Sequence, residues 1–343
     1  MDYRMLELMA PPDTIREARK IVEQEQVLGV WTDTLDDSCS ILRVLINTNR
    51  TEALSDRLTQ KFSSADGFRI MLFSVEATVP QPEVDQEDET ADDTNGENDS
   101  SKSDLGRISR EELYADVSSG SDLNWVYIGM VILSTIVAGV GLVRDDVAVI
   151  IGAMVIAPLL GPNVSMALAA TLGDLKLGWR SLKANAVGVF SSLAVALLMG
   201  LLMEVDLNSQ QLINKTNVSM GDISIALAAG SAGVLAFSRG VPAAIVGVMV
   251  AVALLPPLVN VGLLLGAGYT GLAVGSMILT FTNLICINLA GILTFLMQGV
   301  RPRTWWDAQK AKKAARTAIA IWLVLLIILA VIIWFWNLTF NPL

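Results

Sequence analysis

The sequence predicts an α-helical polytopic membrane protein of about seven transmembrane helices, preceded by a small α+β domain. The mean hydropathy is +0.54, with 53% hydrophobic and only 17% charged residues, far from the average of soluble proteins. The apolar residues are also segregated along the chain. From residue 124 onward they form runs of roughly 17–25 residues, the length a helix needs to cross the hydrocarbon core of a bilayer. Before residue 124 there is neither such a run nor a signal-peptide pattern.

Residues 1–79 are expected to form a small cytoplasmic domain. Strand-like and helix-like patterns follow one another in the order βαββαβ, which is that of a ferredoxin-like fold. This fold carries many functions and therefore implies none by itself. A structural or dimerising module and a ligand-sensing regulatory domain both remain open. The expected strands are 3–9, 27–32, 40–46 and 68–75, and the expected helices are 13–24 and 51–62.

Residues 80–106 are expected to be a disordered acidic linker. Nine Asp and Glu residues and no Lys or Arg lie between positions 81 and 101, so almost all of the net charge of −10 belongs to this segment. Residues 107–121 follow with capping-box spacing between Ser109 and Glu112. We expect this segment to be an amphipathic helix at the inner membrane surface, with Leu113 and Val117 on its apolar side.

The content of reactive residues argues against catalysis. The chain has no histidine, and its two cysteines, Cys39 and Cys286, lie in different regions. The usual zinc and haem sites and any mechanism built on a histidine base are therefore excluded. We expect no enzyme activity, no cofactor, no metal site and no nucleic-acid partner.

Basic residues in the loops predict the orientation of the spans in the inner (plasma) membrane. With the N-terminal domain inside, inner loops hold ten Lys and Arg residues and outer loops hold two. Because inner loops are enriched in basic residues, the N-terminus is expected in the cytoplasm and the C-terminus outside. The expected spans are 125–143, 147–172, 184–203, 223–237, 242–266, 272–297 and 317–336.

An internal repeat is the most informative feature of the sequence. With a shift of 95 residues, 148–173 aligns with 243–268 without a gap, and 11 of the 26 positions are identical. Each copy contains three spans, and an odd number makes the second copy enter the membrane upside down. Residues 122–300 are therefore expected to be a 3+3 inverted repeat about a pseudo-two-fold axis in the membrane plane. Residues 301–343 add a basic inner loop and one extra helix.

Prolines near the middle of the second and fifth spans predict two broken helices, with the breaks at Gly161-Pro162 and at Pro256-Pro257. A proline removes an amide donor and clashes with the preceding turn, although a simple kink is the alternative outcome. Irregular backbone at membrane depth is tolerated only inside protein or beside a water-filled cavity. We therefore expect a substrate site at the two breaks. Its expected lining is Pro158, Gly161, Pro162, Asn163, Ser165, Pro256, Pro257, Asn260 and Asn283.

The other polar residues of the spans are neutral. A lining role and a structural role are equally open for Asn288, whereas a single Ser or Thr is expected to bond to its own helix backbone. No carboxylate lies deep in a span, which argues against a proton relay of buried Asp or Glu. Backbone carbonyls, amides and helix-end dipoles remain as the coordinating groups.

Three stretches resemble the DUF389 family of hydrophobic membrane proteins. They are SREELY at 109–114, LSTIVA at 133–138 and IGAMVIAPLLGP at 151–162, and the last is the most specific. The resemblance covers roughly residues 107–300. It implies a prokaryotic membrane protein with a conserved hydrophobic domain, and it implies no substrate.

The repeat with its broken helices favours a membrane transporter or channel-like permease for a small solute or ion. The alternative is a membrane-bound sensor or signalling protein in which the N-terminal domain is a regulatory module. We also expect a homo-oligomer, because ferredoxin-like domains often pair. The spacings Gly262/Gly266 and Gly271/Gly275 would in addition permit close contacts between helices.

Overall fold

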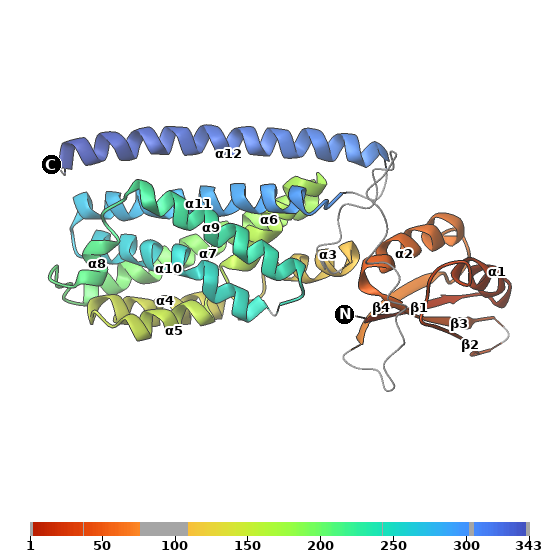
Figure 1. Ribbon diagram of the computed structural model, residues 1–343. Helices are drawn as coiled ribbons and strands as arrows, with labels where there is room; N and C mark the ends of the chain where they lie inside the picture. Colours follow the sequence, from red (N-terminus) through yellow and green to blue (C-terminus); the bar gives the residue numbers. More distant parts are fainter. Residues whose placement is uncertain (1–2, 37, 76–108, 242, 302–304, 341–343) are drawn as a thin grey trace, which may run out of the picture. The chain divides into compact units, whose positions relative to one another are not determined.

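The chain consists of two compact units, Met1–Glu112 and Leu113–Leu343. They are seen in a computed structural model (Figure 1). The expected linker, 80–106, lies outside the described residues. The structure describes residues 3–36, 38–75, 109–241, 243–301 and 305–340.

The first unit is a four-stranded antiparallel sheet with the strand order β2-β3-β1-β4 and two helices. Alternate residues of β1, including Leu6 and Leu8, are fully buried and pack with Ile15 and Ala18 of α1 and Leu58 of α2. One face of the sheet therefore holds the core, and the elements follow the predicted order. They are β1 (Tyr3–Ala10), α1 (Pro12–Val22), β2 (Gly29–Thr34), β3 (Ser40–Asn47), α2 (Thr48–Phe62) and β4 (Arg69–Val75).

Helix α3 (Arg110–Ser119) crosses the boundary between the units in sequence. Ser109 caps it, because its Oγ accepts the Glu112 N–H at 3.3 Å. The Glu112 carboxylate accepts two hydrogen bonds from Arg4, at 2.9 and 3.0 Å. Leu113 and Val117, the expected apolar side of this helix, are both buried.

The second unit is helical throughout its described residues. Side-chain oxygens of Asn124, Asp146 and Asp174 accept backbone N–H groups at the starts of three of its helices, which explains where those helices begin. Its elements after α3 are α4 (Trp125–Val143), α5 (Val147–Ile156), α6 (Leu160–Leu172), α7 (Leu175–Leu202), α8 (Gln210–Asn214), α9 (Met220–Ser238), α10 (Ala243–Gly266), α11 (Thr270–Met297) and α12 (Trp305–Phe340).

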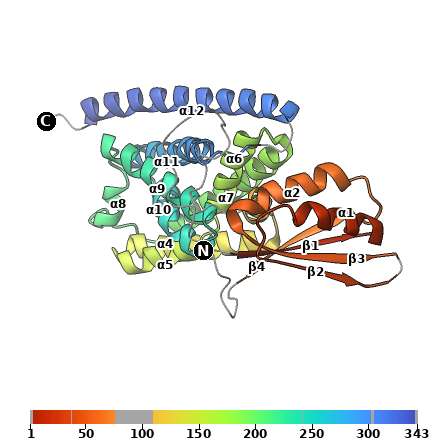
Figure 2. The same cartoon turned by 45° about the vertical axis from the view of Figure 1, so that its right-hand side comes forward.

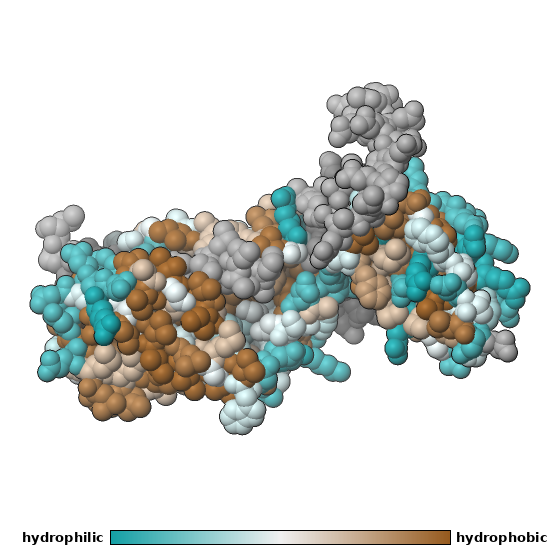
Figure 3. All heavy atoms as spheres, turned by 90° about the horizontal axis from the view of Figure 1, so that it is seen from below, coloured by the Kyte–Doolittle hydropathy of each residue, from teal (hydrophilic) through white to brown (hydrophobic). Residues whose placement is uncertain are grey.

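Among the described residues, five helices are long and apolar enough to cross a membrane, and α5 with α6 makes a sixth if the bent pair is one span. Helix α10, the expected fifth span, adds a shorter described apolar stretch, Ala253–Gly266. The chain is therefore a multi-pass membrane protein. One face of the second unit shows a broad apolar band bordered by hydrophilic residues (Figure 3).

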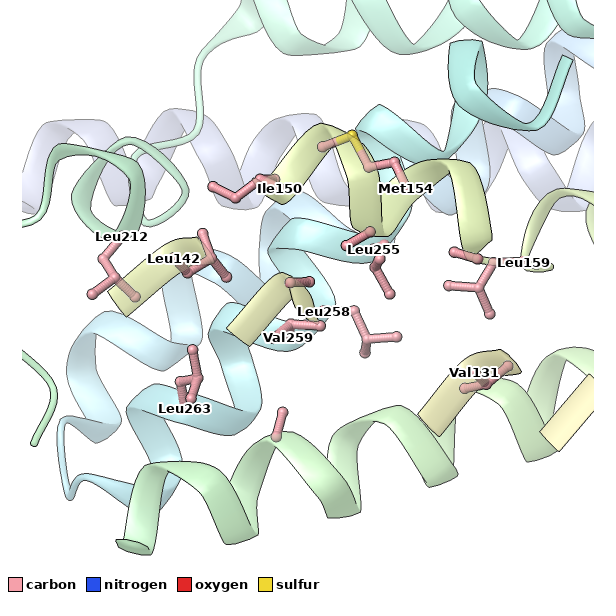
Figure 4. Packing of buried hydrophobic residues seen from close by; sticks show 14 of the residues in the cluster. Val131, Leu142, Ile150, Met154, Leu159, Leu212, Leu255, Leu258, Val259 and Leu263 are labelled. Carbon is pink, nitrogen blue, oxygen red and sulfur yellow. The ribbon is translucent and has the colours of Figure 1, made fainter. Parts of the chain in front are cut away.

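The core of the second unit forms around α10. Leu255, Val259 and Leu263 are completely buried and pack with residues of α4, α5 and α7 (Figure 4). Helix α12 lies along α6 and α11 at the edge of the bundle (Figures 1 and 2). Its membrane-spanning part, Ala311–Phe335, is almost entirely on the surface. The helix therefore adds to the bundle without being part of its centre.

The 95-residue shift found in the sequence also relates whole helices. Helices α4 and α9 both have 19 residues and begin at positions 125 and 220, and α7 and α11 both have 28 residues and begin at 175 and 270. The turns that follow α4 and α9 place the equivalent residues Asp145 and Gly240 at φ of 57° and 71°. Gly173 and Gly268 form a second pair, with φ of 71° and 85°. The two halves therefore share helix lengths and turn geometry.

Contacts between the halves are reciprocal. Helix α7 packs on α10, and α11 packs on α6. A Cβ added to Gly262 would lie 2.4 Å from the Ala196 Cβ, and one added to Gly291 would lie 2.9 Å from the Ala167 Cβ. The shift converts one pair into the other, because 196 corresponds to 291 and 167 to 262. Such exchange of contacts is the property of a two-fold interface.

The same close packing involves three of the four glycines expected to permit contacts between helices. Gly262 and Gly266 face Ala196, Leu197 and Gly200 within the same chain. Gly275 lies against the carbonyl of Thr216. These three glycines pack inside the bundle, whereas Gly271 has open space around it, and the predicted homo-oligomer stays a prediction.

Candidate functional site

The second predicted span is interrupted, as expected, but at residues 157–159, because Gly161 and Pro162 lie inside α6. Helices α5 and α6 meet at an angle of 52°. Ala157 has an extended backbone, with φ of −69° and ψ of 119°, because the ring of the following Pro158 disfavours helical geometry at the preceding residue. Pro162 lies in the first turn of α6, where an amide has no intrahelical acceptor and its loss costs little.

The fifth predicted span is not broken, which corrects the expectation for Pro256 and Pro257. Helix α10 continues through both prolines. Pro257 cannot donate to the carbonyl of Ala253 one turn earlier, but the Asn283 Nδ2 of α11 donates to that oxygen at 2.6 Å. The neighbouring helix thus satisfies the acceptor that the proline leaves free, and the helix need not open. Position 253, which corresponds to Pro158, is alanine.

Three buried asparagines meet beside the break. Asn163 of α6 donates through Nδ2 to the Leu159 carbonyl at 2.8 Å and to Asn185 Oδ1 of α7 at 3.0 Å. Asn288 of α11 donates to Asn163 Oδ1 at 3.0 Å and to the Leu284 carbonyl of its own helix at 2.8 Å. The cluster Asn163–Asn185–Asn288 therefore joins both halves of the repeat at the start of α6.

This asparagine cluster is not a requirement of the repeated fold. The positions related to Asn163 and Asn288 by the 95-residue shift are Leu258 and Leu193. Apolar side chains thus serve at the equivalent place in the other half. The Asn288 Oδ1 is buried and has no hydrogen-bond partner among the described residues. An unpaired buried acceptor costs about 1–3 kcal/mol, so its presence calls for an explanation such as a bound water or ligand.

Ser165 and Asn260, both predicted site residues, hold short helices against the bundle. The Ser165 Oγ donates to the Val117 carbonyl of α3, and the Asn260 Nδ2 donates to the Leu212 carbonyl of α8 at 3.0 Å. The 95-residue shift relates Ser165 to Asn260 and Val117 to Leu212. The two bonds are therefore equivalent, and α3 and α8 occupy equivalent places in the two halves.

Apart from these two equivalent bonds, the contacts around α3 and α8 differ. At α3, Gly161 lies so close to the turn after the helix that its added Cβ would be 2.4 Å from the Gly120 carbonyl oxygen. At α8, Asn260 also donates to Ser276 Oγ at 2.9 Å. The Asn260 Oδ1 is buried and unpaired among the described residues.

Ionisable groups lie at the ends of the helices. Burial raises the pKa of Asp174, but hydrogen bonds from the Leu177 N–H, the Tyr114 hydroxyl of α3 and the Lys176 N–H outweigh it, so the pKa is lowered. Burial lowers the pKa of Lys215, which follows α8, and nearby Asp222 opposes this effect.

The predicted lining thus divides among three places. Pro158, Gly161, Pro162 and Asn163 lie at the break, Ser165 lies under α3, and Pro256, Pro257, Asn260 and Asn283 serve α10 and its contacts. Sequence reasoning missed Asn185. Its signal was an amide at position 185, near the start of an apolar run, and only packing shows that it faces Asn163.

The apolar helices, the bent pair α5 and α6 and the buried asparagines define a multi-pass membrane protein with a polar cluster inside its helical bundle. A model of the family described as "Domain of unknown function (DUF389)" matches residues 154–289, which include the asparagine cluster and all of α10. The chain is 34% identical to an uncharacterized protein of Methanocaldococcus jannaschii, MJ0678, and the alignment covers 97% of this chain and 99% of the relative. The chain therefore belongs to the DUF389 family. No solved structure matches it.

Proposed function

We propose that the protein is a transporter or channel-like permease for a small solute or ion, with its path beside the break between α5 and α6. The observation that carries the proposal is the asparagine cluster at this break, in which the Asn288 Oδ1 has no partner among the described residues. Helix ends and side-chain amides offer both donors and acceptors to a solute that has lost its water. The positions in the other half that correspond to Asn163 and Asn288 are leucines. This difference supports a role of the two asparagines beyond folding.

The proposal includes an inverted repeat of three spans in each half. The reciprocal pairs Ala196/Gly262 and Ala167/Gly291 and the matched helix lengths support a two-fold relation between the halves. With three spans in each half, that axis lies in the membrane plane. The first unit has the strand order of a ferredoxin-like domain, and we place it in the cytoplasm because of the basic inner loops.

A two-fold axis of this kind places α3 and α8 at opposite membrane faces. The second span of each half contributes one hydrogen bond to its helix, from Ser165 at α3 and from Asn260 at α8. Helix α3 is also held by the Tyr114 hydroxyl, which donates to Asp174 at 2.7 Å, and helix α8 by the Gln211 N–H, which donates to Asp145 Oδ1 at 2.8 Å. We propose that they act as two alternating gates over the path. Release of the contacts at one of these helices opens one face, while the contacts at the other helix keep the opposite face closed.

Flux in proteoliposomes tests the function. Purified full-length protein would be compared with protein-free vesicles for Na⁺, K⁺ and Cl⁻ by a potential-sensitive dye, and for small polyols and amino acids by light scattering. Asn163→Leu should abolish the flux that the wild type shows, because it removes the central amide of the cluster. Phe190→Leu, at a 69% exposed position of α7, is the matched control and should retain it.

Two results would contradict the proposal. One is a wild-type flux equal to that of empty vesicles for every probe. The other is an Asn163→Leu variant that is monodisperse and transports normally. Orientation is tested separately by single cysteines in intact cells: a cysteine at position 180 should resist an impermeant maleimide, and one at position 215 should react.

A further inference from the structure

We propose that a cavity between α6, α11 and α12 binds the phosphate head group of an anionic phospholipid. The cavity has a volume of about 510 Å³. It lies where α6 and α11 end and where the membrane-spanning part of α12 begins. The residues that line it are Thr171, Leu296, Val300, Arg301, Ala311, Lys312, Ala315, Arg316 and Ile319.

Three cations border this cavity, and no carboxylate lines it among the described residues. Arg301 follows α11, and Lys312 and Arg316 are one turn apart on α12, so the two α12 side chains lie on one side of that helix. In the described parts of the chain, none of the three forms an ion pair with a carboxylate. A cluster of uncompensated positive charge attracts a phosphate, and guanidinium groups bind phosphate oxygens in pairs.

The rest of the lining fits the apolar part of a lipid. Leu296, Val300 and Ile319 form an apolar wall, and α12 continues from there into its long apolar stretch. The polar ends of the three cations therefore stand at the boundary of the span, at the level of lipid head groups. Basic pockets between transmembrane helices on the inner side commonly hold phosphorylated head groups. A free phosphate would use the cations and leave the apolar wall without a role.

A lipid in this cavity would also explain how α12 stays attached to the rest of the helical bundle. Among the described elements that helix packs mainly on α6 and α11, with a further apolar contact of Ile333 near Val218, and most of its surface faces outward. A lipid bound between α12 and the ends of α6 and α11 would join the extra helix to the repeat through its head group and its acyl chains.

The test uses the full-length protein in a neutral detergent. Phosphatidylglycerol and phosphatidylcholine are titrated separately, and binding is followed by native mass spectrometry and by the shift in Tm. We expect phosphatidylglycerol to bind and to raise Tm, and phosphatidylcholine to do so much less. Because a cation near the head group contributes roughly 1 kcal/mol, or about fivefold in affinity, the double variant K312Q/R316Q should bind about 25-fold more weakly.

Lys313 supplies the matched control. It lies next to Lys312 on α12, is exposed and does not line the cavity. Lys313→Gln removes one positive charge, as Lys312→Gln alone does. It should leave phosphatidylglycerol binding unchanged, whereas Lys312→Gln should weaken it about fivefold. An equal loss in Lys313→Gln would mean diffuse attraction to a basic surface and would overturn the site. Inorganic phosphate alone producing the same Tm shift would overturn the assignment to a lipid.

Discussion

The contact between Asn283 and Ala253 makes a prediction that can be tested by a double-mutant cycle. Asn283→Leu removes the donor that satisfies the carbonyl freed by Pro257, while keeping a side chain of similar size. In a Pro257→Ala background, residue 257 regains an N–H that donates to the Ala253 carbonyl in the ordinary helical pattern. Asn283 then becomes unnecessary for α10. Its replacement should therefore cost much less stability in that background.

The magnitude follows from the burial of the two groups. Asn283 is 5% exposed, and its bond to the Ala253 oxygen is short at 2.6 Å. Hydrogen bonds between membrane helices contribute about 0.6 kcal/mol on average and up to about 1.7. A buried carbonyl left without a donor costs about 1–3 kcal/mol. We therefore expect Asn283→Leu to cost about 1–2 kcal/mol in the wild type and less than about 0.5 kcal/mol in the Pro257→Ala variant.

The free energies of unfolding can be measured by titrating the purified protein with a denaturing detergent in mixed micelles and following helicity by circular dichroism. Thr282→Val is the matched control, because Thr282 is equally buried and its hydroxyl donates only to the Ile278 carbonyl of its own helix. Its cost should be the same in both backgrounds. An Asn283→Leu cost that does not change with Pro257→Ala would refute the account of why α10 stays continuous.

Two further predictions concern packing and pH. Gly262→Ala should lower Tm because its Cβ would lie 2.4 Å from the Ala196 Cβ and 2.9 Å from the Leu197 backbone nitrogen. Adding Ala196→Gly should restore part of the loss, since it removes the first of these contacts and reproduces the pair seen in the other half. A double variant no more stable than Gly262→Ala would contradict the reciprocal packing. The lowered pKa of Asp174 in the folded protein stabilises the fold at pH values above the unfolded pKa of about 3.8, and this contribution is lost as pH falls through the folded pKa. Asp174→Asn, which can still cap α7, should therefore make Tm less dependent on pH between about 5 and 3; an unchanged pH profile would argue against this role.

Much of the architecture could be predicted because it depends on local patterns. The expected span 125–143 coincides with α4, and the strand and helix order of the first unit agrees with the alternation of its residues. Helix starts were harder to place. Helix α7 begins at Leu175, nine residues before the expected span, because Asp174 caps a polar first part that hydropathy does not detect.

The site shows where local reasoning stops. Pro158 and Pro257 are both prolines within apolar helices, and sequence alone predicts a break at each. The tertiary structure separates them, because Asn283 supplies a donor at α10, whereas the backbone at Ala157 turns away from the helix. Whether α10 stays continuous therefore depends on Asn283, which lies 30 residues along the chain from the Ala253 acceptor.

The sequence by itself determined the membrane class, the order of the units and the 95-residue repeat, since each follows from composition or from residues compared along the chain. Only the tertiary structure decided which amides meet. Asn163, Asn185 and Asn288 come from three helices, and their contact depends on the angle at which α6 leaves the break. The same holds for α3 and α8, whose equivalence is visible only in the bonds from Ser165 and Asn260. A buried polar group needs a hydrogen-bond partner. The sequence shows that such a partner is needed, but only the tertiary structure shows which residue it is.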